Sequence, residues 1–439
     1  MIAAMKRHGA DALAETVAAS EAAPLQDWPE TVVGGKYVRL LERHVQALRD
    51  ETPHGNRQLF LDDVFILSLL AFHNPTLRSL RTREDFSQTR QAQKHLSIRK
   101  VCRSTLADFL SLADPTRLQP VLDHLRSELA RKQVIRGDAA DLHSLLKRTV
   151  AVDGTFLPAL ADVAWAVGSR NQHAQPKRYR ARIDCQLAVD TFVPELFVIP
   201  DPGQSETSSA AQHVQAGKLY VYDRGFSGYE LINAHYEPDA DVPEGWSDKA
   251  QFVIRYKPAG ANSPALQEAA EQPLTDADHQ AGVLSDRSGV LGGSSAKHVV
   301  LPVRLREVRI QTEENGKPGT LRLITNLHEV PAATIGLLYR QRWQIELFFR
   351  WLKSIAHFTH LINRTRAGLL TELYVTLIGV LLMYLHTGYR PSKYLFSLLS
   401  TGAGLDELLP ILRNRERECE LARQSAARRA AKKRAAKNQ

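Results

Sequence analysis

The segment YRQRWQIELFFRWLK, residues 339–353, places four chemically useful side chains at helical spacing. Because an α-helix turns about 100° per residue, these side chains fall within an arc of about 60° along roughly 21 Å of helix. They are Tyr339, Arg342, Glu346 and Lys353. Apolar residues border the arc and would pack the helix onto a core, namely Leu338, Ile345, Phe349 and Leu352. The helix therefore presents one carboxylate flanked by two cations and a phenol beside a buried face.

This polar face has two interpretations. Cations spaced along a helix suit a phosphate backbone, since arginine binds phosphate bidentately and lysine acts as a point charge. Arg342 and Glu346 are also four residues apart, which suits a plain intrahelical ion pair. Trp343 lies on the far side of the arc, and we interpret it as a core residue, the alternative being a platform that stacks on an unpaired base.

Two further carboxylates, Asp153 and Asp223, each follow an apolar run that is typical of a strand. Neighbouring strand ends can bring two aspartates together, where like charges repel and raise a pKa unless a divalent cation neutralises them. Mg²⁺ prefers oxygen ligands, so two aspartates and a glutamate suit it. Two such ions about 3.5–4 Å apart can activate a water or a 3′-hydroxyl and stabilise the leaving oxygen, which is the chemistry of phosphodiester cleavage and strand transfer. Aspartate at a strand end is also common turn chemistry, so neither residue is decisive alone.

The elements that would position these residues begin with a helical N-terminal region. Residues 1–35 are alanine-rich and irregular, and we expect little order there. Over residues 36–147 apolar side chains recur at spacings of three and four, which predicts an all-helical domain. Its segment 81–104 is markedly basic, which suits a helix-turn-helix-like DNA contact as well as a solvated surface. We interpret residues 36–147 as a helical DNA-binding region.

A mixed pattern starts at residue 148. Strand-like runs and short helices alternate there in the order β-β-β-α-β-α-β. The strands are expected at 148–153, 180–190, 194–201, 218–223 and 251–258, and the helices at 204–215 and 227–236. Strands interleaved with helices predict an α/β fold, with a mixed sheet flanked by helices.

A β-rich insertion is predicted over residues 259–328, which are rich in Gly, Ser and charge. One long helix is expected to follow over 331–355, with Pro331 at its start, where proline is tolerated. Further helices are expected over 363–412 as a candidate dimerisation segment.

The C-terminal part contains an apolar run and a basic tail. The run at 373–385 is shorter than the roughly 20 residues that a membrane span needs, so it predicts a buried core helix. The tail, 413–439, ends in a stretch rich in Lys and Arg without acids from 423 onward. We expect this last stretch, residues 423–439, to be disordered, or helical only on a polyanion.

The composition favours a polyanionic partner. The chain has 57 Lys and Arg against 48 Asp and Glu, a net charge of +9. A basic protein without any special partner would have the same balance. The cysteines at 102, 185 and 419 are far apart and lack C-x-x-C spacing, which disfavours disulfides and a cysteine-bound zinc and fits a reducing cytosol. The N-terminus has no apolar core of the signal-peptide type. We interpret His357 and His360 as structural, not as ligands.

Three motifs occur in a fixed order: VDGT at 152–155, YDRGF at 222–226 and Y-x2-R-x3-E-x6-K at 339–353. In this combination the chain resembles the DDE transposases of bacterial insertion sequences, in the group marked by a Tyr-Arg-Glu-Lys helix. The resemblance covers about 148–362, and the helix motif is its specific part. It implies a ribonuclease H-like catalytic core with a β insertion before the last catalytic helix.

The resemblance also implies roles for single residues. The metal-binding catalytic triad would be Asp153, Asp223 and Glu346. The side chains that hold DNA phosphates near the cut would be Tyr339, Arg342 and Lys353. Arg224 is expected either to contact DNA or to fix the turn after Asp223. The expected cofactor is Mg²⁺, with two ions bound and Mn²⁺ able to substitute.

The expected function is that of a transposase that cleaves transposon ends and joins them to target DNA. Its partners would be the transposon ends, the target DNA and a second copy of the chain, in the bacterial cytoplasm near the nucleoid and without a membrane. Two alternatives stay open. One is a nuclease of the same fold without strand transfer, and the other is a catalytically inactive, domesticated DNA-binding protein.

Overall fold

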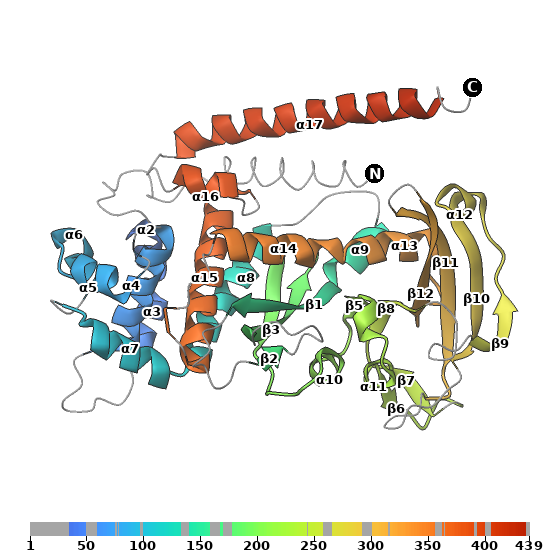
Figure 1. The fold of residues 1–439 in the computed structure, drawn as a ribbon, viewed down its shortest axis with the longest axis horizontal. Coiled ribbons are helices and arrows are strands. Elements are labelled where there is room, and N and C mark those ends of the chain that lie inside the picture. Colours follow the sequence, from blue (N-terminus) through green and yellow to red (C-terminus); the bar gives the residue numbers. More distant parts are fainter. Residues whose placement is uncertain are drawn as a thin grey trace. The chain divides into compact units, whose positions relative to one another are not determined.

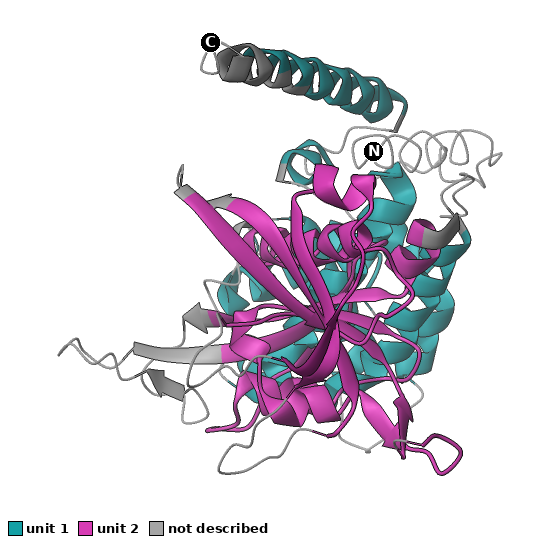
Figure 2. Ribbon diagram, turned by 90° about the vertical axis from the view of Figure 1, so that its right-hand side faces the viewer, with its two compact units in different colours: residues 1–135, 362–439 teal, residues 136–361 magenta. Residues whose placement is uncertain are grey.

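The computed structural model describes residues 35–435, apart from gaps at 50–58, 75–76, 78, 97–99, 133–139, 159–166, 170–177, 244, 258–265, 292–300, 315–316, 356–361, 364, 390–392 and 400–404 (Figure 1). The chain divides into two compact units (Figure 2). Unit 1 comprises residues 1–135 and 362–439, and unit 2 comprises residues 136–361.

The described part of unit 1 consists of helices. From its N-terminal segment come α2 (Gly35–Leu40), α3 (Glu42–Arg49), α4 (Leu61–His73), α5 (Leu80–Ser87), α6 (Arg90–Gln93), α7 (Arg103–Leu112), the 3₁₀ turn η1 (Pro115–Leu118) and α8 (Gln119–Lys132). From its C-terminal segment come α15 (Arg366–Thr387), α16 (Lys393–Leu399) and α17 (Leu405–Ala435). Helix α15 packs against α4, α7 and α8, so the two segments share one core. The DNA-binding and dimerisation roles expected of them stay predictions.

Helix α15 contains the apolar run at 373–385. By length and composition it could cross a membrane, but 78% of its most apolar window is buried inside the structure. A buried ion pair ties it to the N-terminal segment, since Arg83 Nη1 lies 2.8 Å from Oε1 of Glu372. The prediction of a buried core helix is confirmed.

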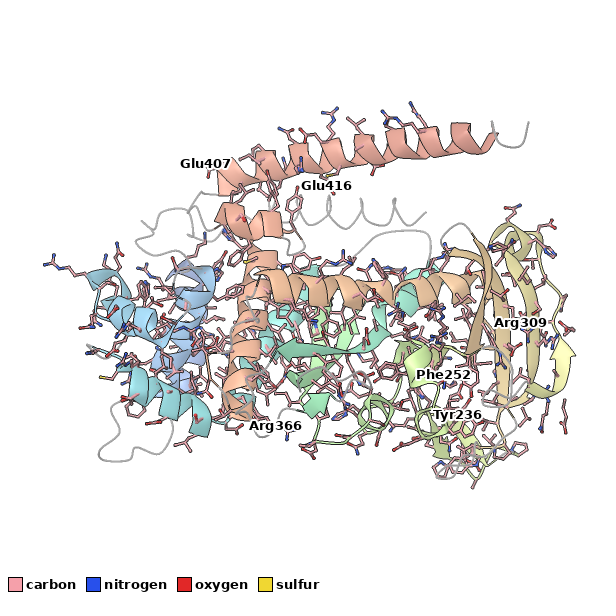
Figure 3. The ribbon with its side chains drawn as sticks, viewed as in Figure 1. Tyr236, Phe252, Arg309, Arg366, Glu407 and Glu416 are labelled. Carbon is pink, nitrogen blue, oxygen red and sulfur yellow. The ribbon has the colours of Figure 1, made fainter. Side chains whose placement is uncertain are left out.

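Helix α17 corrects the expectation for the basic tail. It runs from Leu405 to Ala435 and passes through Pro410 (Figure 3), so residues 423–435 are helical, and the prediction of disorder there is wrong. The reason is local, because the segment is built mainly of Ala, Arg, Lys and Glu, which are strong helix formers.

Unit 2 is built on a mixed sheet of ten strands, in the order β2-β3-β1-β5-β8-β12-β11-β10-β9, with β4 paired to β3. The first part contains β1 (Thr149–Pro158), β2 (Val167–Ser169), β3 (Arg178–Ala188), β4 (Val193–Val198), β5 (Leu219–Tyr222) and β8 (Gln251–Arg255). Strands β1, β5 and β8 are parallel neighbours, and the other pairs are antiparallel. The predicted mixed sheet flanked by helices is confirmed.

The parallel strands form the core that positions the site. All four residues of β5 are fully buried, as expected for a central strand covered on both faces. Apolar residues of α10 (Glu206–Ala211), α11 (Tyr229–Asn233) and a small hairpin of β6 (Tyr236–Pro238) and β7 (Trp246–Asp248) pack into the core of this sheet. Helix α9 (Ala140–Lys147) precedes β1. The predicted element order holds, with β2, β6 and β7 added. The predicted end of the first strand at Asp153 is wrong. Strand β1 continues to Pro158 because β3 pairs with it along that length.

The insertion extends the same sheet. It contains β9 (Leu266–Glu271), α12 (Asp276–Gln280), β10 (Val283–Leu291), β11 (Arg304–Glu314) and β12 (Lys317–Thr325). Strand β12 pairs antiparallel with β8, so the insertion continues the sheet beyond the parallel core (Figure 1). The prediction of a mostly β segment is confirmed.

The long helix predicted over 331–355 is divided into α13 (Ala332–Arg340) and α14 (Trp343–Ile355). Between them, the N–H groups of Arg342 and Ile345 donate to carbonyls only three residues back, at 3.0 and 3.2 Å. Such bonds tighten the chain into a 3₁₀-like turn. The prediction of one continuous helix is therefore wrong at Gln341 and Arg342.

Candidate active site

Asp153 and Asp223 lie side by side where the parallel pairing of β1 with β5 ends. The register of β1 and β5 ends with Val152 opposite Tyr222, and each aspartate is the residue that follows in the chain. Both side chains are half-buried. Asp153 is still inside β1, where it pairs with Cys185 of β3. The parallel pairing, more than the strand end, brings the two carboxylates together.

The environment of Asp153 disfavours its charge. Burial raises the pKa of Asp153 to about 6. The N–H of Gly154, which donates to Oδ1 at 2.8 Å, and the charge of Arg342 oppose this rise, whereas the carboxylates of Glu206 and Asp223 add to it. An added positive charge nearby would therefore stabilise the ionised form of this carboxylate.

Tyr339 and Arg342, two residues of the helix motif, interact with these two aspartates. The Tyr339 hydroxyl donates to Asp223 Oδ1 at 3.1 Å. Burial and the neighbouring Asp223 raise the pKa of Tyr339 to about 12, so the phenol stays a neutral donor at pH 7. Arg342 Nη2 donates to Glu346 Oε1 at 2.5 Å, and its charge also acts on Asp153 and Asp223. Arg342 thus links Glu346 to the two aspartates.

Arg255, the last residue of β8, also belongs to the site and was not predicted from the sequence. Its Nη1 lies 4.0 Å from Asp223 Oδ1. The register pairs Tyr222 with Ile254, so Arg255 is the neighbour of Asp223 on the next parallel strand. The signal was available in QFVIR, a third strand that ends in a charged residue.

Glu206 and Asp184 were missed as well. Glu206 is in the first turn of α10, and Asp184 lies opposite Gly154 on β3. A Cβ atom on residue 154 would lie 2.8 Å from Glu206 Oε1 and 3.1 Å from Asp184 Oδ1. Glycine in the VDGT motif therefore leaves room for these carboxylates beside Asp153. Arg182 compensates part of their charge through an ion pair with Asp184 at 2.9 Å.

The other predicted residues lie on the same elements. Glu346 is in the first turn of α14, and Lys353 is half-buried in its last turn. Arg224 is exposed in the 3₁₀ turn η2 (Arg224–Phe226) that follows Asp223. Trp343 is 48% exposed, with the Arg350 guanidinium 5.9 Å from its ring centroid, so its interpretation as a core residue is wrong. His357 and His360 lie outside the described residues.

Residues 144–382 match the family described as the transposase DDE domain. The chain belongs to the DDE transposase family. It is 25% identical over 195 residues to a protein of Sinorhizobium fredii (strain NBRC 101917 / NGR234) named "Putative transposase y4zB", covering 44% of this chain and 50% of the relative. It is 36% identical over 76 residues to "Probable transposase for insertion sequence element IS5377" of Geobacillus stearothermophilus, covering 17% of this chain and 20% of the relative. The chain thus spans half or less of the length of these two relatives.

The acids of this DDE transposase fit a divalent cation by donor chemistry. Asp153 and Asp223 offer adjacent oxygen ligands, which suit Mg²⁺ and not a soft metal. In the arrangement described, Glu346 is engaged by Arg342, and among the described residues no three His, Cys, Asp or Glu side chains converge closely enough to hold a metal ion. The metal-binding role of the complete triad stays a prediction.

Proposed function

We propose that this DDE transposase cleaves transposon ends and joins them to target DNA, with Asp153, Asp223 and Glu346 as its acidic triad and Mg²⁺ as its cofactor. Two ions would bind, and Mn²⁺ would substitute for them. One observation carries the proposal. The two aspartates are neighbours across a parallel strand pair, and Tyr339 of the helix motif donates to one of them at 3.1 Å.

The acids and Tyr339 have separate tasks. Divalent ions held by the three carboxylates would activate the attacking water or 3′-hydroxyl and stabilise the leaving oxygen. Asp153 is oriented by the Gly154 N–H, which donates to its Oδ1. The neutral phenol of Tyr339 fixes the rotamer of Asp223 and leaves the other carboxylate oxygen for a second partner.

Arg342 has two tasks in this proposal. Without DNA it neutralises the acids and pairs with Glu346. When a DNA end arrives, the guanidinium exchanges this pair for a bidentate contact with a phosphate, which releases the carboxylate of Glu346. Further phosphate contacts come from the same surroundings, made by Tyr339, Lys353, Arg224 and Arg255.

The remaining regions would serve DNA binding and assembly. We assign the helices of residues 36–147 to DNA binding, and the C-terminal helices to a homodimer that holds two transposon ends. Exposed arginines along α17, among them Arg413, Arg417 and Arg428, suit contact with a polyanion. Such a protein would act in the bacterial cytoplasm, near the nucleoid.

The deciding experiment is an end-cleavage assay on DNA that carries the sequences flanking the reading frame, with and without Mg²⁺. Wild type should cut at the ends only with the metal, and Asp153→Ala should cut slower by a factor on the order of 10³ or more, with end binding retained. Glu237→Ala, an exposed acid of β6, serves as the matched control and should cut like wild type.

The outcomes separate the candidate functions. Full cleavage by Asp153→Ala would remove Asp153 from the mechanism. Cleavage without joining to a target plasmid would leave a nuclease of the same fold. Binding without any metal-dependent cleavage would leave a DNA-binding protein that has lost catalysis.

A further inference from the structure

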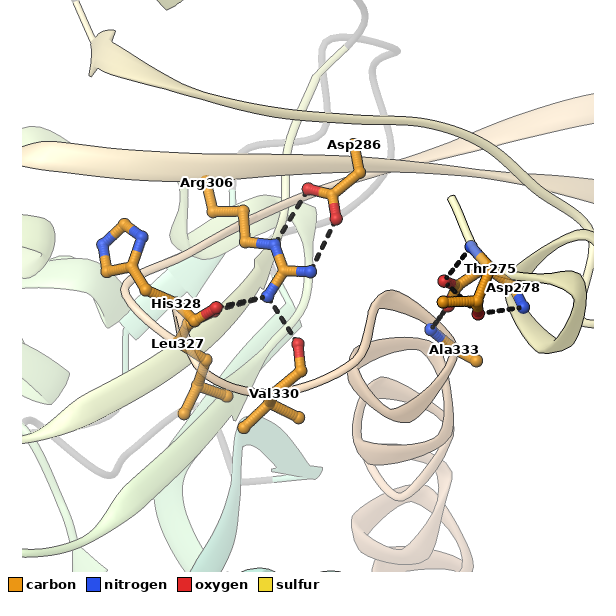
Figure 4. A network of polar contacts seen from close by, with 8 residues as sticks. All are labelled: Thr275, Asp278, Asp286, Arg306, Leu327, His328, Val330 and Ala333. Atoms are coloured by element: carbon orange, nitrogen blue, oxygen red, sulfur yellow. Dashed lines mark hydrogen bonds and ion pairs between the residues drawn. The ribbon is translucent and has the colours of Figure 1, made fainter. Parts of the chain in front are cut away.

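The N-terminus of α13 is capped from the β insertion. The N-cap residue is Pro331, whose side chain offers no acceptor, although the first N–H groups of a helix need acceptors. The N–H of Ala333 instead donates to Asp278 Oδ1 at 2.8 Å, across 55 residues of sequence (Figure 4). Asp278 belongs to α12, so the insertion supplies the cap that the sequence around Pro331 lacks.

Asp278 is held rigidly for this task. It is only 4% exposed. Its other oxygen, Oδ2, accepts the backbone N–H and the hydroxyl of Thr275 at 3.0 and 2.7 Å, and its own N–H donates to Thr275 Oγ1 at 3.2 Å. This capping box uses one carboxylate oxygen for α12 and directs the other at α13.

Arg306 holds the connector that leads into α13. Its guanidinium makes a bidentate pair with Asp286 of β10 at 2.8 and 2.6 Å. The remaining nitrogen, Nη1, donates to the carbonyls of Leu327, His328 and Val330 at 3.0, 3.1 and 2.5 Å (Figure 4). Arg306 is 7% exposed, so three carbonyls just before Pro331 are fixed to the sheet by one buried side chain.

The packing of α13 leaves it little freedom to shift. A Cβ on Gly336 would lie 2.6 Å from Cδ1 of Ile310 on β11, so the helix backbone sits directly against the insertion. The far end of α13 carries Tyr339, whose hydroxyl donates to Asp223. From Ala332 to Tyr339 the helix is about 10 Å long, so a tilt at its start displaces Tyr339 and the following Arg342.

We propose that Asp278 and Arg306 are positioning residues of the cleavage reaction, which hold α13 so that Tyr339 and Arg342 face Asp223. This inference rests on the function proposed above. The β insertion then has a defined task, because it sets the place and direction of the catalytic helix from outside the parallel core. A misplacement of about 1 Å at a reacting group can slow a reaction on the order of 100-fold.

The test compares Asp278→Ala and Arg306→Lys with two controls. Asp278→Asn keeps an oxygen for the Ala333 N–H, and Asp276→Ala removes an exposed acid of the same helix. Hydrogen–deuterium exchange is measured for a peptide covering 332–345 and, as reference, for one covering β1. Single-turnover end cleavage and end binding are measured with Mg²⁺. Each cleavage rate is also measured in a Tyr339→Phe background.

Asp278→Ala and Arg306→Lys should raise exchange in 332–345 and leave β1 protected. Their cleavage should fall roughly 10- to 100-fold with end binding unchanged, while Asp278→Asn and Asp276→Ala stay within about threefold of wild type. In the Tyr339→Phe background the additional loss should shrink, because both changes act through the same contact.

Unchanged exchange in 332–345 would overturn the inference. So would a loss of cleavage rate that is as large in the Tyr339→Phe background as in wild type. If Asp278→Ala does not fold, Arg306→Lys decides by the same criteria, with Asp278→Asn and Asp276→Ala still serving as its controls. A wild type that cuts no DNA would refute the proposed function, whereas the exchange data would still decide whether the insertion holds α13.

Discussion

Carboxylates and arginines meet both in the β insertion and at the candidate active site, and the two places differ in how far the charges are matched. In the insertion, Asp286 forms a bidentate pair with Arg306. Glu307, 1% exposed, accepts from Arg309 at 2.8 Å and from Arg322 at 2.5 Å. Each of these acids has arginine partners and little contact with water.

At the active site the balance is different. Asp153 and Asp223 are neighbours and half-buried, and the carboxylate of Glu206 adds to their repulsion. Arg255 approaches Asp223 only to 4.0 Å, and the short bond of Arg342 goes to Glu346. The acids here lack full compensation.

Acidic residues alone therefore do not mark a functional site in this fold. A buried, fully paired carboxylate fixes architecture, whereas an under-compensated pair keeps affinity for a further cation. Removing an acid at these two places should therefore change the stability with opposite signs.

The largest effect is expected in the insertion, from Glu307→Gln. The change keeps the shape and removes the charge, which leaves Arg309 and Arg322 facing each other without a counter-charge. Breaking a buried ion pair from one side costs about 3–5 kcal/mol. Urea unfolding should show this loss, with Glu237→Gln as an exposed control. A loss below about 1 kcal/mol would mean that the insertion does not depend on its charge pairing.

The opposite sign is expected for Asp153→Asn at the active site. Burial raises the pKa of Asp153 from 3.8 to about 6, so the folded protein prefers the neutral form. In the metal-free wild type this group therefore lowers stability as pH rises from about 4 through 6. Asp153→Asn removes that cost and should gain about 1–3 kcal/mol at pH 7.

The measurement is urea unfolding of both proteins from pH 4 to pH 8 without divalent cations. The difference between them should be near zero at pH 4, grow up to about pH 7 and then level off. A variant that is less stable than wild type at pH 7, or a difference that does not change with pH, would show that Asp153 is compensated in the way the insertion acids are.

Local patterns in the sequence predicted the main strands of the mixed sheet and part of the site. The apolar run before Asp223 predicted β5 and its end near that residue, because a fully buried strand is a continuous apolar stretch. The helical arc around Glu346 predicted the buried face of α14, where Ile345 and Leu352 are indeed 0% exposed. Both inferences needed only neighbouring residues.

Features that depend on distant partners were beyond such patterns. Strand β1 runs past Asp153 because β3 pairs with it from about thirty residues further along the chain. Arg255 is a neighbour of Asp223 only because of the register between β5 and β8. Trp343 is exposed, although an aromatic side chain in an apolar segment is typical of a core residue. The tight turn at Arg342 leaves the apolar periodicity nearly unchanged, so periodicity alone could not find it.

The smallest effect concerns Arg342, which separates the two kinds of charge pairing most sharply. An insertion arginine such as Arg322 is part of the permanent structure, whereas in the proposed function Arg342 would compete with a divalent cation for the same acids. Arg342→Gln removes this competitor from Glu346 and from the two aspartates. The DNA-free protein should then bind Mn²⁺ roughly tenfold more tightly, equivalent to about 1.4 kcal/mol. Calorimetry or the electron paramagnetic resonance signal of free Mn²⁺ measures this affinity directly.

Arg340→Gln is the matched control, because Arg340 is an exposed arginine at the end of α13. It removes the same charge from the same helix motif and should leave the Mn²⁺ affinity within about twofold, since exposed charges at a distance are screened. Arg342→Gln should also weaken binding of the DNA end, because the arginine that leaves the acids is the one that meets the phosphate. If Mn²⁺ binds no better to Arg342→Gln than to Arg340→Gln, the arginine does not compete for the acids. The active site would then be paired as permanently as the insertion, and the contrast between the two places would disappear.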